Sequence, residues 1–278
     1  MKVIRIIFSL IIILQSSLMS ADDYIMEVGQ FEKLKINSDI NLVYSNHPDS
    51  TGYARYTAPS GNNGLFLLIN KGKGILRVQS AQTQWEPNEL PTLYVYSDFL
   101  TSVESSSNQN VLLQNLVACA SFSVNLIGNG TVIVDNIKCN NFSAAITTGS
   151  GTINASGSCI NASFRMVGAG LISADRLEAE NVKCSILGTG SIGCWPIDNL
   201  SIKGIGSTKI YYKGHPNIKK TGGGKIYELP EENRDRTGVK IDSFKEANEV
   251  LIESEETDEN LDPDEEDEGI QTIVTNND

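Results

Sequence analysis

A short glycine motif recurs at nearly regular intervals in this chain of 278 residues, and it constrains the fold more than any other feature. Its copies begin 16 to 21 residues apart, if two degenerate copies at 107–109 and 206–208 and a last one at 222–224 are counted. A unit of about 20 residues cannot bury an apolar face alone, so neighbouring units must stack on one another. Glycine pairs suit the corners of such a stack, where the backbone turns or approaches closely. The intact copies pair Gly128 with Gly130, Gly149 with Gly151, Gly168 with Gly170, and Gly188 with Gly190.

A β-branched aliphatic residue stands four positions after the start of every copy. This constancy predicts one inward-facing site that is repeated on each turn. A second set of mostly apolar residues recurs every 20 positions, and around it apolar and polar residues alternate with the period of two that is typical of strands. The first set is Val111, Val132, Ile153, Ile172, Ile192, Ile210 and Ile226, and the second is Phe122, Phe142, Ala162, Val182 and Ile202.

Like residues at matching positions of five to seven units predict an all-β fold, a parallel β-helix with rungs of about 20 residues. An antiparallel sandwich also has short strands at regular spacing, but it has no need for like residues in register. Residues 25–105 alternate like strands without a clean period. We therefore expect an irregular β cap over residues 25–105, which protects the end of the solenoid, and regular rungs over residues 106–228.

The first 20 residues have the three-part organisation of a secretory signal peptide. Lys2 and Arg5 form a basic start, Ile6 to Leu14 an apolar core, and Ser16 to Ala21 a small, polar exit. The apolar core is shorter than the roughly 20 residues that cross a bilayer, and no later stretch is long and apolar enough. We therefore expect cleavage after Ser20 or Ala21, no stable membrane span, and export to the periplasm, the cell surface or the medium.

The net charge of −12 is concentrated in the last 50 residues. Residues 21–228 carry 16 basic and 16 acidic groups, whereas residues 229–278 carry 4 basic and 18 acidic groups. A neutral body disfavours nucleic acid as a partner, because phosphate backbones are bound by basic surfaces. The composition of residues 229–278 predicts an acidic, mostly disordered tail.

Three of the five cysteines, Cys119, Cys139 and Cys159, are 20 residues apart and are expected to stack on consecutive rungs. The spacing of rungs lies within the range of Cα separations that a disulfide accepts, so a 119–139 or a 139–159 bridge is sterically feasible. The alternative, which we favour, is a column of small apolar side chains. Ala179 and Asn199 are expected at the same position of later rungs.

No motif of catalysis or cofactor binding stands out. Residues 188–193 match the Gly-x-Gly-x-x-Gly fingerprint of dinucleotide sites, but that fingerprint requires a strand that enters a helix, so we expect no nucleotide. His47 and His215 each precede a proline in turn-like sequence, and nothing marks a catalytic triad around them. The few acids of the repeats, such as Asp135 and Asp175, are expected at solvated turns. We therefore expect no catalytic residues, no metal and no cofactor.

Three segments together resemble a known family. They are the opening GQFEKLKI of residues 29–36, the serial Gly-x-Gly rungs, and the ending GSTKIYYKGHP of residues 206–216. They resemble the putative auto-transporter adhesin, head GIN domain family of exported bacterial proteins, over about residues 28–228. The resemblance implies a right-handed β-helix and a role in adhesion. The chain departs from the family in its acidic tail and in the serine that often precedes each glycine pair, which is replaced by Ile127, Thr148, Val167 and Leu187.

The expected function is that of an exported, non-catalytic β-solenoid that presents a lateral surface to a glycan or to an envelope or cell-surface protein. Two alternatives remain open on the same scaffold: a glycan-active enzyme, which would need clustered carboxylates or a metal, and a structural component of the envelope. No residue in the sequence marks the binding surface. Several asparagines, among them Asn141, Asn161 and Asn199, begin Asn-x-Ser/Thr triplets, which matter only in a glycosylating host.

Overall fold

The computed structural model describes residues 21–81 and 90–229. The predicted signal peptide and all of the predicted acidic tail except Leu229 lie outside these residues. The first described strand is β1 (Ala21–Glu27). Over the described part of the chain there is no α-helix, and therefore none that could cross a membrane.

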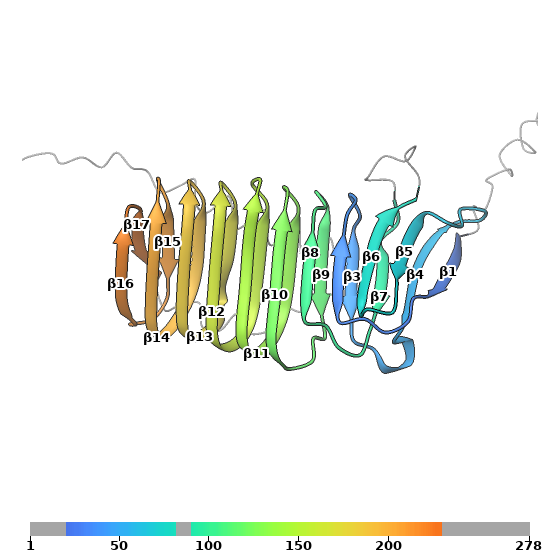
Figure 1. The fold of residues 1–278 in the computed structure, drawn as a ribbon, viewed down its shortest axis with the longest axis horizontal. Coiled ribbons are helices and arrows are strands. Elements are labelled where there is room, and N and C mark those ends of the chain that lie inside the picture. Colours follow the sequence, from blue (N-terminus) through green and yellow to red (C-terminus); the bar gives the residue numbers. More distant parts are fainter. Residues whose placement is uncertain (1–20, 82–89, 230–278) are drawn as a thin grey trace, which may run out of the picture. The chain divides into compact units, whose positions relative to one another are not determined.

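The regular part of the fold is a parallel β-solenoid, as predicted (Figure 1). Four long strands, β11 (Thr131–Thr148), β12 (Thr152–Gly168), β13 (Leu171–Gly188) and β14 (Ser191–Ile205), pair in parallel and in register. Each begins on one long side of the solenoid, bends, and ends on the other, and a glycine corner leads to the next. The shorter strands that complete the rungs before and after them are β8 (Ser102–Ser105), β9 (Asn110–Gln114), β10 (Cys119–Ile127), β15 (Lys209–Tyr212), β16 (Asn217–Gly222) and β17 (Lys225–Glu228).

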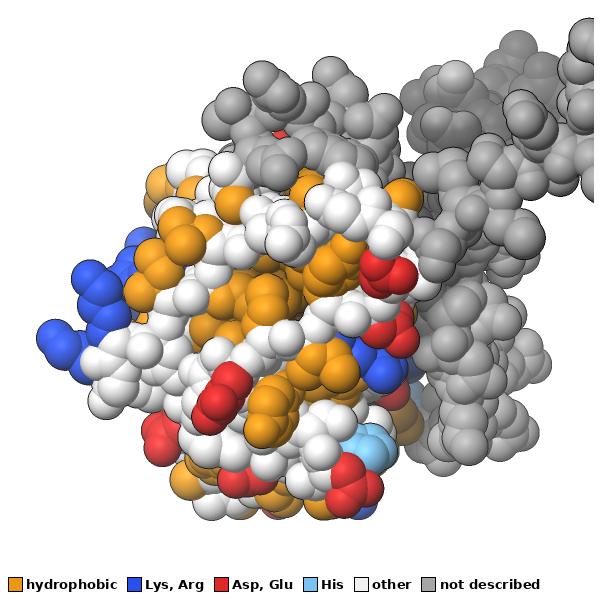
Figure 2. Space-filling view, turned by 90° about the vertical axis from the view of Figure 1, so that its right-hand side faces the viewer, with side chains coloured by type: hydrophobic (Ala, Val, Ile, Leu, Met, Phe, Trp, Pro, Cys, Tyr) orange, Lys and Arg blue, Asp and Glu red, His pale blue; other side chains and the backbone are white. Residues whose placement is uncertain are grey.

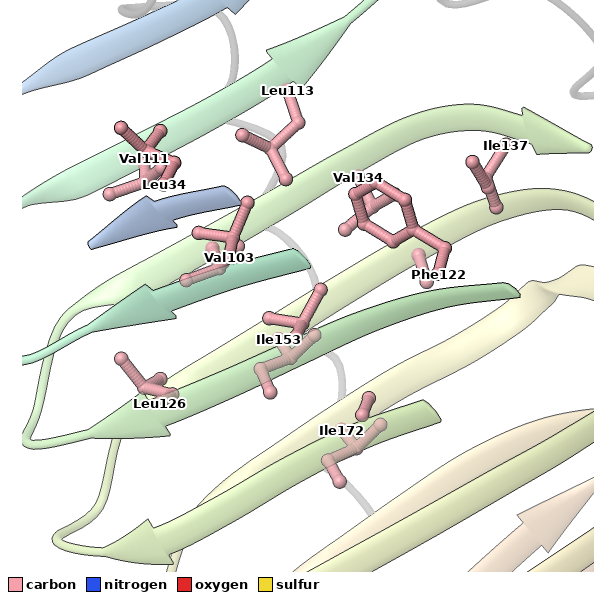
Figure 3. Close-up of a cluster of buried hydrophobic side chains, with 14 of the residues drawn as sticks. Leu34, Val103, Val111, Leu113, Phe122, Leu126, Val134, Ile137, Ile153 and Ile172 are labelled. Carbon is pink, nitrogen blue, oxygen red and sulfur yellow. The ribbon is translucent and has the colours of Figure 1, made fainter. Parts of the chain in front are cut away.

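One long side, the isoleucine side, carries the aliphatic column. Val111, Val132, Ile153, Ile172, Ile192, Ile210 and Ile226 are successive register partners. All except Ile226, which belongs to the last strand, are buried, with at most 1% of their surface exposed. Figure 3 shows Val111, Ile153 and Ile172 among the side chains of this interior. Continuous burial along the axis supplies the apolar area that a single rung lacks.

The other long side, the asparagine side, is named for the row Asn141, Asn161, Asn181 and Asn199 on its outer surface. Its inner column begins as predicted, with Phe122, Phe142, Ala162 and Val182 in register. The prediction that Ile202 is the fifth member is wrong, because Leu200 pairs with Val182 and Ile202 pairs with Cys184. The cause is the bend of β14, where the Ala174–Cys194 and Asn181–Asn199 pairs enclose two fewer residues in β14 than in β13.

The section before residue 105 contains two parallel rungs, and they do not stack in chain order. β2 (Lys33–Ile36) and β3 (Leu42–Ser45) form one rung, and β6 (Ile75–Ser80) and β7 (Leu93–Tyr96) form the other. β2 pairs with both β6 and β8, and β3 pairs with both β7 and β9. The earlier rung is therefore inserted between two that follow it in sequence, which explains why this section has no clean period.

Antiparallel strands close the N-terminal end. β4 (Tyr53–Pro59) pairs with β7 and β1, and β5 (Phe66–Asn70) pairs with β6; a short 3₁₀ turn (Pro48–Ser50) leads into β4. Figure 2 views this end and shows hydrophobic side chains gathered near its centre. Exposed apolar residues of these strands include Ile25, Tyr53 and Leu67.

The glycine corners exist because successive turns approach too closely for any side chain. A Cβ at Gly149 would lie 2.3 Å from the carbonyl oxygen of Gly128, and a Cβ at Gly188 would lie 2.1 Å from that of Gly168. Gly188 also has a φ of 140°, which residues with a side chain rarely adopt. The repeated glycine therefore follows from the stacking itself.

Candidate functional site: a polar groove along the asparagine side

A groove of about 720 Å³ runs along the asparagine side across several rungs. Two rows of outward side chains form its walls. Its floor lies between the rows, along the strand positions of the inner column Phe122, Phe142, Ala162 and Val182. Asn141, Asn161, Asn181 and Asn199 form the first row, after Ser121. Ser102, Ser123, Ser143, Ser163, Lys183 and Ser201 form the second row, and Lys33 and Thr101 lie at one end.

The first row is a continuous ladder of hydrogen-bonded amides. The Nδ2 of Asn161 donates to the Oδ1 of Asn141 at 3.2 Å, Asn181 donates to Asn161 at 3.2 Å, and Asn199 donates to Asn181 at 2.8 Å. Parallel register produces this ladder, because it places each amide directly above the previous one, about 4.8 Å away. Each donating amide uses one N–H in the ladder, so a second N–H and further acceptor capacity remain for a ligand.

The second row consists of hydroxyl groups interrupted by one lysine. Ser102, Ser123, Ser143, Ser163, Lys183 and Ser201 are register partners along the side. The Ser123 hydroxyl donates to that of Ser102 at 2.9 Å, whereas Ser143 and Ser163 are exposed. Successive side chains of a strand alternate between faces, so the amide and hydroxyl rows flank the inward-facing column.

The groove is neutral to basic. The residues that line it include two cations, Lys33 and Lys183, and no acid. The neighbouring outer row of the same side adds Arg165 and Lys203, and its one acid among the described residues, Glu104, is paired with Lys35. The groove therefore presents regularly spaced hydrogen-bonding groups with a weak positive potential.

A second groove, of about 620 Å³, follows the bend and contains the predicted cysteine column. Cys119, Cys139 and Cys159 are register partners, and Ala179 continues the column. The next member is Pro196, and the prediction that Asn199 occupies this position is wrong, because the shortened bend of β14 moves Asn199 into the asparagine row.

All three thiols of the column are free in the structure. Burial raises the pKa of Cys139 to about 12 and that of Cys159 to about 11, and it also raises the pKa of Cys119. Neighbouring cysteines contribute to the shift at Cys139. These thiols are protonated at neutral pH, as expected of packing side chains. The packing column that we favour and the alternative, a 119–139 or 139–159 disulfide, both stay predictions.

The remaining polar residues singled out in the sequence lie in turns and ion pairs. His47 precedes the 3₁₀ turn, and the exposed His215 pairs with Glu228 at 3.4 Å. Asp175 accepts a hydrogen bond from Ser173 and pairs with Lys213 at 3.2 Å. Across residues 21–81 and 90–229, no three His, Cys, Asp or Glu side chains gather as metal ligands.

Residues 188–193, which match the nucleotide fingerprint, span a corner between β13 and β14. In this setting the glycines permit one turn of the solenoid to lie against the next.

The asparagine ladder is the feature that our sequence analysis missed. The signal was present, since Asn141, Asn161 and Asn181 are 20 residues apart and Asn199 follows after 18. We interpreted three of these residues as the starts of glycosylation triplets, and Asn199 also as a member of the cysteine column. A search for columns of outward polar residues, in addition to inward apolar ones, would have found the row.

The fold and the groove together define a class: a β-solenoid whose repeated turns build an extended, polar lateral surface. The chain belongs to the putative auto-transporter adhesin, head GIN domain family, whose model matches residues 30–216. Comparison with curated proteins finds no match.

Solved structures of similar fold include proteins from Bacteroides and Parabacteroides. A putative adhesin from Bacteroides fragilis has a TM-score of 0.65 at 21% identity, and one from Parabacteroides merdae has 0.58 at 20%. A putative lipid binding protein from Parabacteroides distasonis has 0.57 at 19%. Each comparison covers 76% of this chain and 97% of the other. At these identities the likeness shows the fold.

Proposed function

We propose that this protein is an exported, non-catalytic adhesin that binds an extended glycan chain along the groove of the asparagine side. The observation that carries the proposal is the continuous amide ladder from Asn141 to Asn199, flanked by the row of serine hydroxyls. Sugar hydroxyls both donate and accept hydrogen bonds, and amide and hydroxyl side chains match this chemistry in both directions.

The geometry of the rows favours a linear ligand that lies parallel to the solenoid axis. Ser121 and the four asparagines occupy five successive rungs, which extend about 19 Å at about 4.8 Å per rung. The interval between rungs is close to the length of one pyranose in an extended chain, so each sugar can meet an equivalent pair of polar side chains. Because the ladder holds the amides in place, little side-chain freedom remains to be lost on binding.

The charge of the groove supports binding rather than hydrolysis. Glycoside hydrolysis ordinarily uses two carboxyl groups on either side of the scissile bond. The residues that line the groove carry hydroxyl, amide and ammonium groups. Lys33 and Lys183 also favour a glycan that is neutral or carries scattered carboxylates over a polycation.

The proposal is tested by measuring the affinity of the mature chain for linear oligosaccharides of increasing length on a glycan array and by calorimetry. We expect affinity to rise with each added sugar and to level off near five. Asn161→Ala should weaken binding by about three- to tenfold, since one hydrogen bond contributes about 0.5–1.5 kcal/mol. Asn140→Ala, an exposed asparagine beside the second groove, is the matched control and should bind normally.

Two results would contradict the proposal. One is affinity that does not depend on chain length or on Asn161. The other is binding to an envelope protein or to lipid vesicles, with no binding to any glycan. Thermal unfolding of both variants shows whether Asn161→Ala acts on the groove or on the fold.

A further inference from the structure

The two cysteines outside the stacked column, Cys184 and Cys194, form a buried pair at one corner of the solenoid. Cys184 lies four residues before the corner glycine Gly188, and Cys194 lies four residues after Gly190. Both side chains are 0% exposed. Cys184 belongs to the asparagine side and Cys194 to the isoleucine side, so one rung brings the two thiols together from opposite sides.

Both thiols are free in the structure, and Cys184 is close enough to Cys194 to raise the pKa of that thiol. Three of the four register neighbours of the pair have larger side chains than cysteine. Cys184 lies between Phe164 and Ile202 in its column, and Cys194 lies between Ala174 and Tyr212. No other rung places cysteines at both of these register positions.

We propose that the exported protein carries a disulfide between Cys184 and Cys194, which links the two long sides of one rung through the core. The proposal depends on export to an oxidising compartment, where such bonds form and persist. It does not depend on glycan binding. The bond requires the sulfurs of these two inward-facing residues to approach to about 2.05 Å.

The reaction is a thiol–disulfide exchange with an external disulfide, either a small molecule or a protein oxidant. One cysteine thiolate attacks a sulfur of the oxidant and forms a mixed disulfide. The second cysteine then displaces the oxidant as a thiol. The two cysteines lose two protons and two electrons in total, and the external disulfide gains them as a dithiol.

The timing of the reaction follows from the burial of the pair. In the finished fold the pKa of Cys194 is well above the usual value, first because of its hydrogen bond with Cys184 and then because of desolvation. A buried, protonated thiol reacts slowly. The bond therefore forms while the corner at 188–190 closes and before the neighbouring rungs cover it.

Trypsin provides a direct test, because Cys184 and Cys194 are the two cysteines of one peptide, residues 184–203, which has no internal Lys or Arg. The full chain is exported with its own residues 1–20, denatured without reductant in the presence of iodoacetamide, and digested. We expect this peptide to be unalkylated and lighter by two hydrogens than the dithiol form. Reduction before alkylation should add two carbamidomethyl groups.

Two controls show whether the missing alkylation is specific to the Cys184–Cys194 pair and whether it depends on export. Peptide 139–165 contains Cys139 and Cys159 and reports the stacked column separately in the same digest. Chain that is produced without residues 1–20 in a reducing cytosol should give a doubly alkylated peptide 184–203 and unfold several degrees lower. Cys184→Ala should abolish that difference in unfolding temperature. Folded, exported protein whose peptide 184–203 carries two alkyl groups would overturn the proposal.

Discussion

Gly188 and Gly61 show how differently two glycines with positive φ can contribute to the same fold. Gly188 has a φ of 140°, and a Cβ there would meet the carbonyl oxygen of Gly168 at 2.1 Å. Gly61 has a φ of 89°, and a Cβ there would have no heavy atom within 4 Å. The first position combines backbone strain with a collision against a fixed backbone, and the second has strain alone.

We expect Gly188→Ala to lower the free energy of unfolding by about 3 kcal/mol or more, and Gly61→Ala by about 1–2 kcal/mol, the ordinary cost of an unfavourable φ. Urea unfolding of the two variants measures the difference. Equal losses would mean that the corner relaxes freely and that close stacking does not select glycine.

Thr208 occupies the position that glycine holds in the intact corners, and it places a hydroxyl group in the core of the described residues. The side chain is 1% exposed, and its Oγ1 has no hydrogen-bond partner among the described residues. A buried polar group without a partner costs about 1–3 kcal/mol. We therefore expect Thr208→Val, which keeps the shape and removes the hydroxyl, to stabilise the protein by about 1 kcal/mol. Thr208→Ser keeps the hydroxyl and should not. A destabilised Thr208→Val variant would show that this hydroxyl is satisfied in solution.

Cys139 provides a prediction about pH. Burial raises its pKa to about 12 from the ordinary value of 9.0. At pH 8 its thiolate fraction is therefore about a thousandfold lower than that of a free cysteine, and alkylation of the reduced, folded protein should be slower by about that factor. Because the pKa of Cys139 is raised in the folded state, its contribution to the free energy of unfolding is fully present below pH 9 and is lost as the pH rises toward 12. Peptide 139–165 reports the rate, and urea should restore it. Rapid alkylation of the folded chain at pH 8 would contradict the assigned burial.

Within the strands, the repeated inward positions were predictable because each rung meets the same neighbours. In-register stacking requires each rung to fill a similar interior volume. Two adjacent positions can share that volume differently: Phe142 and Ala144 of one rung are followed by Ala162 and Phe164 of the next. Phe142 and Phe164 remain in edge contact, with ring centroids 6.3 Å apart. The prediction that Ile202 continues the column failed because the bend of β14 contains fewer residues than the bend of β13. Local backbone geometry sets the number of residues in a bend, and the average repeat length does not reveal it.

Ile172 and Asp135 test the assignment of inside and outside. Ile172 is fully buried in the aliphatic column, whereas Asp135 lies at a bend and accepts one hydrogen bond from Ser156 at 3.3 Å. We expect Ile172→Asp to cost several kcal/mol or to prevent folding, because it buries an unpaired carboxylate. Asp135→Ala should change stability by at most about 1 kcal/mol. Circular dichroism and urea unfolding measure both, and similar losses would count against the inward column.

At the scale of the whole molecule, the order of the rungs could not be derived from the sequence. The rung at 33–45 is inserted between rungs formed by residues 75–96 and 102–114, so its partners lie about 40 to 70 positions away in the chain. Apolar alternation shows that these segments are strands, but it does not say which strands are neighbours. The part of the asparagine ladder from Asn141 to Asn181 follows from the period, whereas Asn199 joins it through the shortened bend of β14. The use of the row as a binding surface depends on the groove that the assembled sides create.

The stacking order leads to a prediction about the distribution of stability. In a solenoid each rung contacts only its neighbours, so a rung with partners on both sides is held more firmly than a terminal one. β2 and β3 have partners on both sides although they come early in the chain, whereas β16 and β17 pair on one side only among the described strands. β16 is also exposed throughout.

We therefore expect hydrogen exchange to show strong protection of amides in β2, β3 and β11 to β13, and fast exchange in β16 and β17 through local opening. Ile210→Ala, in β15 beneath β17, should accelerate exchange in β17 much more than in β2, since coupling passes from rung to rung. Uniform protection along the axis would indicate that the solenoid opens only as a whole. Fast exchange in β2 and β3 would mean that the inserted rung is not held from both sides.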